Sequence, residues 1–281
     1  IRLFYAPQGE ATGWLDFDIA AMAEVGGRPV LDAFLMLLSA EHLYADPLST
    51  LALMQKSRSD QAQVTSELAR QVHDALVILL DGLHQAALRD GRGLAAMTKA
   101  EAELFYRGAL SFLLRMVFVL YAEAHGLLPT DAPAYARHMS LGGLFDVLMD
   151  DAAQYPDTMG QRFGAYARVL SLFRLVYEGT DTKTEPGQGT GEAADRLFIP
   201  ARRGGLFDPK RFEFLECWSG IAGDTAVQVP SVDDKTLYEV LSRLMVLGGQ
   251  RLSYKVLDVE QIGSVYEALM GFHVEVAGSE A

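Results

Sequence analysis

Apolar side chains recur every three or four positions along most of the chain. One such run follows Pro29 and ends near residue 46, and a second follows Pro47 and continues to Gly91. This spacing places the apolar residues on one face of an α-helix and predicts two helices. Because the second run is longer than a typical helix, we expect a break near residues 57–59.

The stretch at residues 98–126 is apolar around nearly its whole circumference. Thr98 and Glu101 form the capping-box pattern that starts a helix, and Gly126 followed by Pro129 marks its end. A helix that is apolar on all sides is surrounded by protein. We therefore expect this stretch to form the central buried helix of the fold.

The remaining pattern completes a mainly α fold, an irregular multi-helix bundle with a few short strands near the termini. The first twenty residues hold aromatics, Gly and Pro and predict an extended arm or a short strand, and residues 252–256 alternate as a strand does. Shorter helices are predicted at residues 140–150, 163–177, 232–247 and 259–270.

Small polar residues interrupt the helical pattern at residues 179–193. Their composition predicts a loop and the best candidate for a domain boundary. We expect an N-terminal helical bundle with an extended arm at residues 1–178, a flexible loop at 179–196, and a smaller helical subdomain at 197–281.

The net charge of −13 limits the expected partners. So acidic a surface repels phosphate backbones at long range, and contact with DNA would need a local basic patch. Arg202, Arg203, Lys210 and Arg211 stand close together in the chain and are the candidate DNA or phosphate contacts. The alternative is a cluster of surface ion pairs with neighbouring acids such as Glu213 and Glu216.

Arg115 lies within the predicted central helix. A buried guanidinium without a partner is costly, so we expect a structural pairing with Glu123 or Glu101. Arg115 also breaks the longest apolar run, which is too short to span a bilayer, and no membrane partner is expected. The single cysteine excludes an internal disulfide and fits a reducing cytoplasm.

The patterns that could carry catalysis are weak. The glycines at 187–191 follow a polar stretch and not a buried strand, which favours a linker over a nucleotide-binding loop. Asp224, Asp233 and Lys235 imitate the two acids and one lysine of a Mg²⁺-dependent nuclease, but acids in the first turn of a helix favour capping. We expect no catalytic, cofactor-binding or metal-binding residue in this chain, and a nuclease is the less favoured alternative.

Four phrases resemble, in the same order, segments of large bacterial restriction–modification methylases. Residues 57–61 resemble their SRxxQ segment, and residues 112–129 resemble their phrase RLLFLLYAEARGLLP. Residues 204–208 resemble their NGGLFD, with Arg203 where Asn is usual. Residues 256–270 resemble their LdVeqLGsvYEgLLe, with one Gly replaced by Ala.

The resemblance is to the helical region just upstream of the methyltransferase domain in adenine-specific DNA methylases. Relatives include type IIG-like restriction enzymes and the methylases of the DISARM and BREX phage-defence systems. The resemblance implies a fragment without the catalytic domain, so S-adenosylmethionine would bind only in the full-length protein. The chain has no asparagine and no Asp-Pro-Pro phrase to hold a flipped adenine, and is not itself a working methyltransferase of that class.

The function implied by the resemblance is that of a non-catalytic connector in the bacterial cytoplasm. Tyr266 and Glu267 would face the methyltransferase domain, and the basic pair Arg202 and Arg203 would lie near DNA or another defence-system protein. The alternative is a stand-alone protein–protein interaction module of a defence complex. A coding frame that continues past residue 281 into methyltransferase motifs would distinguish the two.

Overall fold

The computed structural model gives the protein as two compact units, Ile1–Ser66 and Glu67–Ala281, each described here by itself. The fold is mainly α-helical with a few short strands, as the sequence predicted. The structure describes residues 1–6, 13–44, 49–92, 94, 97–180, 198–218, 228–257, 263 and 267, without the side chains of 25, 58–66 and 256. The predicted boundary loop at 179–196 lies almost entirely outside these residues, and the division there stays a prediction.

The first unit begins with an antiparallel hairpin of β1 (Arg2–Tyr5) and β2 (Gly13–Asp16). Arg2 lies opposite Asp16 and donates to both oxygens of its carboxylate, at 2.6 and 2.9 Å. The guanidinium also lies over the Trp14 ring, 5.2 Å from its centroid. The predicted arm or short strand at the N-terminus is therefore a two-stranded sheet.

Short helices follow the hairpin: α1 (Ile19–Ala23), η1 (Val25–Gly27), α2 (Arg28–Leu38) and α3 (Ala40–Tyr44). Pro29 lies in the first turn of α2, where its missing N–H has no helical partner to lose. Phe17 packs edge-on against Phe34 with ring centroids 5.1 Å apart, yet α2 has no fully buried residue. The apolar face of α2 is thus only partly covered within this unit.

Helix α4 (Thr50–Arg89) starts in the first unit and ends in the second, and it runs for 40 residues without interruption. The predicted break near residues 57–59 is wrong. Serine destabilises a helix only slightly relative to alanine. No Gly or Pro lies between Thr50 and Asp81 to interrupt the helical hydrogen bonds.

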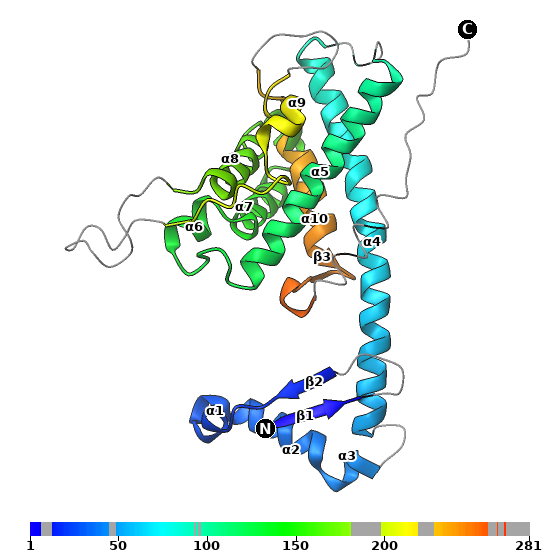
Figure 1. Ribbon diagram of the computed structural model, residues 1–281, viewed down its shortest axis with the longest axis vertical. Helices are drawn as coiled ribbons and strands as arrows, with labels where there is room; N and C mark the ends of the chain where they lie inside the picture. The colour runs from blue at the N-terminus through cyan, green and yellow to red at the C-terminus, as the bar shows by residue number, and fades with distance from the viewer. Residues whose placement is uncertain are drawn as a thin grey trace, which may run out of the picture. The chain divides into compact units, whose positions relative to one another are not determined.

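Helix α5 (Lys99–Ala124) is the centre of the second unit, as predicted (Figure 1). The Thr98 and Glu101 capping box is present, with the Thr98 N–H donating to Oε2 of Glu101 at 2.8 Å. Its buried side chains lie all around the helix and include Phe112, Leu113 and Met116. Among the described elements it is the one helix long and apolar enough to cross a bilayer. However, 72% of its most apolar window is buried within the unit, as in the core helix of a soluble protein.

Shorter elements pack around α5 (Figure 1). They are α6 (Pro133–His138), α7 (Leu141–Gln154), η3 (Pro156–Gln161), α8 (Ala165–Glu178), η4 (Pro209–Phe212), α9 (Glu213–Glu216) and α10 (Asp234–Met245). Helix α7 contacts both α5 and α10, and α10 also contacts α8 and η3. At Gly108 of α5 an added Cβ would lie 2.2 Å from the Phe214 ring, so glycine is needed where α9 crosses.

After α10 the chain forms a tight hairpin that the sequence analysis missed. Strands β3 (Val246–Leu247) and β4 (Gln250–Arg251) pair across Gly248 and Gly249, whose φ angles of 57° and 80° suit a two-residue turn. The strand predicted at 252–256 is wrong, since this stretch holds the 3-10 helix η5 (Tyr254–Val256). Of the helix predicted at 259–270, the structure describes only residues 263 and 267.

Candidate functional site

Residues 198–208, which we call the strap, cross the C-terminal end of α8. The N–H of Arg202 donates to the carbonyl of Val176 at 3.1 Å, and the N–H of Arg203 donates to that of Tyr177 at 3.2 Å. These carbonyls belong to the last turn of α8, where no following helical turn supplies an N–H to them. The strap thus completes the hydrogen bonding of the helix end.

Arg115 of α5 holds the other end of the strap. Its side chain is 1% exposed, with Nε donating to the carbonyl of Leu206 at 2.7 Å and Nη2 donating to that of Asp208 at 3.2 Å. Burial lowers the pKa of this guanidinium, although the nearby Glu216 carboxylate raises it. The partners expected from the sequence, Glu123 and Glu101, are wrong. The observed acceptors are backbone carbonyls of a distant loop, which helical spacing does not reveal.

Glu123 has a different structural role near the end of α5. Its carboxylate accepts hydrogen bonds from the N–H of Leu141 at 2.9 Å and from the hydroxyl of Tyr135 at 3.0 Å. Burial raises the pKa of this carboxyl, while the hydrogen bonds lower it. Glu123 therefore fixes the start of α7 against α5, where an acid also suits the helix N-terminus.

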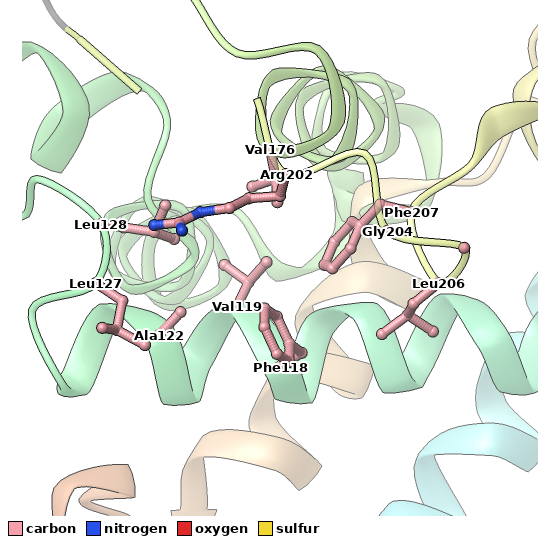
Figure 2. A pocket seen from close by; sticks show the side chains of 11 residues that line it. Phe118, Val119, Ala122, Leu127, Leu128, Val176, Arg202, Gly204, Leu206 and Phe207 are labelled. Carbon is pink, nitrogen blue, oxygen red and sulfur yellow. The ribbon is translucent and has the colours of Figure 1, made fainter. Parts of the chain in front are cut away.

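A pocket of about 430 Å³ lies between the strap and the C-terminal half of α5 (Figure 2). Its floor comes from buried residues of α5 and α8, and at its rim Phe118 and Leu127 are 44% and 54% exposed. Apart from Arg202, every lining side chain is apolar. The lining residues are Phe118, Val119, Ala122, Leu127, Leu128, Val176, Arg202, Gly204, Gly205, Leu206 and Phe207.

Arg202 is the charged group of this pocket. Figure 2 shows its side chain extending from the strap across the pocket toward Leu128. In the part of the chain that the structure describes, its guanidinium has neither an ion pair nor a hydrogen bond. An exposed cation therefore lies across the opening of an apolar cavity.

The other predicted basic residues are neighbours of Arg202 in the sequence. Arg203, Lys210 and Arg211 are exposed, and Nη1 of Arg211 donates to the carbonyl of Gly205 at 3.4 Å. Among the described residues none of them is in an ion pair with an acid. Of the alternative partners, Glu216 is buried and bound to Arg174 at 2.7 Å. Glu213 is exposed and is in no ion pair among the described residues. We call these four residues, which are close together in the sequence, the basic cluster, and their contact with phosphate stays a prediction.

Of the two acids of the nuclease alternative, the structure describes Asp233, which lies at a helix end. Asp233 accepts from the N–H of Thr236 at 2.8 Å as the N-cap of α10, and it pairs with Arg89 at 3.0 Å. Lys235 is 61% exposed and lies 3.9 Å from Glu239. Asp224 lies outside the described residues. No group of three or more His, Cys, Asp or Glu suited to a metal ion occurs among the residues that are described.

The predicted interface to a methyltransferase domain falls largely outside the described residues. Tyr266 is not among them, and Glu267 is exposed. The glycines at 187–191 are also not among them. The roles assigned to these residues stay predictions.

Arg202 was predictable from the sequence as a basic residue, whereas the pocket that it crosses was not. Phe118 and Val119 follow the same helical pattern as the core residues of α5, so their spacing does not tell a pocket from a core. No protein-family model matches the chain, and neither curated proteins nor solved structures give a significant match. The strap and its pocket are therefore interpreted from their own geometry.

Proposed function

We propose that this chain is a non-catalytic helical connector of an adenine-N6 DNA methyltransferase that uses S-adenosylmethionine, from a bacterial restriction–modification or phage-defence system. The connector would pack against the methyltransferase domain in the cytoplasm and hold it in position. S-adenosylmethionine would bind to that domain, and this segment would carry no cofactor.

One contact carries the proposal. The phrases at 112–129 and 204–208, which both resemble methylase segments, are joined by the hydrogen bonds from Arg115 to Leu206 and Asp208. Chance matches to two phrases some ninety residues apart have no reason to meet in space. Their contact supports the interpretation that they form one structural element of a shared fold.

The position of Arg203 gives a second, smaller support. Its φ of 40° lies in the left-handed region, which most L-residues avoid and which Asn tolerates better. The resembled phrase has Asn at this position. A strap with the same backbone would explain that Asn, and Arg203 would then be a local departure from it.

The experiment is to follow the coding frame past residue 281 and to assay the whole product. We expect the frame to continue into a Gly-x-Tyr-Tyr-Thr-Pro phrase and an Asn-Pro-Pro-Tyr phrase. The purified full-length protein should transfer tritiated methyl groups from S-adenosylmethionine to adenines in unmethylated plasmid DNA.

A stop codon directly after residue 281 would contradict the proposal and favour a stand-alone interaction module. Cleavage of the plasmid by the isolated chain with Mg²⁺ would favour the nuclease alternative instead. The connector role does not require the basic cluster to touch DNA.

A further inference from the structure

We propose that the pocket under the strap is a docking site for an acidic segment of a partner protein. The segment inserts one large apolar side chain into the cavity, and its carboxylates pair with Arg202 and the neighbouring basic residues. This inference is independent of the connector role, because it rests only on the pocket and the cluster beside it.

The cavity has the size and the lining of a site for an apolar group. Its volume of about 430 Å³ lies in the range of known ligand sites, roughly 300–1,000 Å³. Val119 and Val176 form buried parts of its wall, while Phe118 at the rim is partly exposed. Interfaces commonly place an aromatic or aliphatic anchor in such a pocket and surround it with polar contacts. A Leu, Phe or Trp side chain fits this chemistry.

The charge of the surroundings selects an acidic partner. Arg202 lines the pocket, and Arg211 donates to the carbonyl of Gly205 at its edge. With Arg203 and Lys210 they are four cations within residues 202–211 of a chain whose net charge is −13, and none of the four is in an ion pair among the described residues. A second copy of the chain, with the same net charge, would be repelled at long range. Carboxylates flanking an apolar anchor complement the cluster and fix the register of binding.

Nucleic acid fits the pocket less well than such a segment. Duplex phosphates would pair with the cations but would leave the apolar cavity empty. An extruded base needs several polar groups to hydrogen-bond its edge, whereas Arg202 is the only polar side chain among the described residues that line the pocket. The net negative charge further opposes DNA.

Two glycines of the strap leave room for a close partner. An added Cβ at Gly205 would have no atom within 4 Å, and at Gly204 it would meet only a backbone oxygen at 4.0 Å. Neither glycine is among the residues with positive φ, so the backbone conformation does not require glycine at these positions. Glycine at both positions keeps the edge of the pocket open to the backbone of a bound segment.

The test is a selection from a phage-displayed library of random dodecapeptides against the purified chain. We expect enrichment of sequences with one or two large apolar residues next to Asp or Glu. Fluorescence anisotropy with the synthetic peptides should show that Arg202→Glu and Gly205→Leu each weaken binding about tenfold, since one loses a charged contact and the other fills the opening.

Matched controls separate docking from charge and folding. Arg107→Glu makes the same charge change at an exposed position of α5, and Gly160→Leu makes the same substitution at another glycine with open space. Both should bind peptide like the wild type, and all four variants should keep the wild-type thermal midpoint by circular dichroism.

The proposal is overturned if no enriched peptide loses affinity in the Arg202→Glu and Gly205→Leu variants. It is also overturned if the enriched peptides lack acidic residues. If no such peptide is found, a labelled DNA duplex is tested instead. Binding of this duplex with a salt dependence that Arg202→Glu reduces would show that the basic cluster binds phosphate.

Discussion

The pentapeptide Gly-Gly-Leu-Phe-Asp occurs at residues 142–146 and again at 204–208, and its two copies have different structures. The first copy is helical within α7, whereas the second forms the end of the strap and a turn. Both bury their phenylalanine, with Phe145 3% and Phe207 5% exposed. The five residues therefore set which side chain is buried, and their surroundings set the backbone.

The flanking residues explain the difference. Before the first copy, Ser140 caps α7 by accepting from the N–H of Gly143 at 2.9 Å. After the second copy, Pro209 disfavours the helical region at Asp208, whose ψ of 115° is extended. Arg115 then holds the non-helical carbonyls of this copy, which have no helix ladder to satisfy them.

The largest expected effects come from the two phenylalanines. Phe145→Ala should lower the free energy of unfolding by about 3–5 kcal/mol, because its ring is enclosed between α7 and α10. Phe207→Ala should cost less, about 2–3 kcal/mol, since one side of its ring already faces the pocket. Urea unfolding followed by circular dichroism measures both.

Phe118→Ala is the matched control for this pair. Its side chain is 44% exposed, so the loss should stay below about 1.5 kcal/mol. An equal cost for Phe145→Ala and Phe207→Ala would show that the pocket is closed in solution.

The next effect comes from Arg115, which supports only the second copy. Arg115→Met should lower the free energy of unfolding by about 2–3 kcal/mol, because the carbonyls of Leu206 and Asp208 lose a charged donor. Hydrogen exchange should become faster at residues 204–208 and remain slow at residues 142–146. Arg107→Met, on the exposed face of α5, should change stability by less than about 0.5 kcal/mol. Equal acceleration in both copies would contradict a local role for Arg115.

The same contrast shows how far the sequence could predict this fold. Helix α5 was predictable because its capping box and its apolar circumference are local properties of residues 98–126. The hairpin across Gly248 and Gly249 also had a local signal, the paired glycines, which the alternation at 252–256 obscured. The uninterrupted α4 shows that serine is a weak reason to end a helix.

The candidate site was less predictable because it depends on contacts between distant segments. The basic residues were visible in the strap, but the cavity exists only because Arg115 and the end of α8 hold the strap over α5. The burial of an arginine predicts that its guanidinium has a hydrogen-bond acceptor, but it does not identify that acceptor. Residue spacing cannot identify a carbonyl as that partner when the carbonyl lies 91 positions away.

A smaller effect is expected at the cap of the first copy. Ser140→Ala removes the acceptor for the Gly143 N–H and should cost about 1 kcal/mol. Exchange should become faster at the start of α7 and not in the strap, the reverse of the Arg115→Met result. Ser171→Ala removes a hydroxyl from the exposed middle of α8, where it bonds only the preceding turn, and should have almost no effect. If Ser140→Ala also leaves the free energy of unfolding unchanged, the hydrogen bonds from Glu123 alone suffice to start α7.

The smallest effect tests the backbone that leads into the second copy. Arg203→Asn should raise the free energy of unfolding by about 0.5 kcal/mol, because Asn tolerates the left-handed φ of 40° better than Arg. Arg202→Asn is the control, since it removes the same charge from a neighbouring position that is not among the residues with positive φ. An equal gain from both variants would mean that relief of charge repulsion within the basic cluster, and not backbone strain, is the cause. A gain at Arg203 alone would show that the strap keeps its turn at a measurable conformational cost, which the first copy, inside a capped helix, does not have.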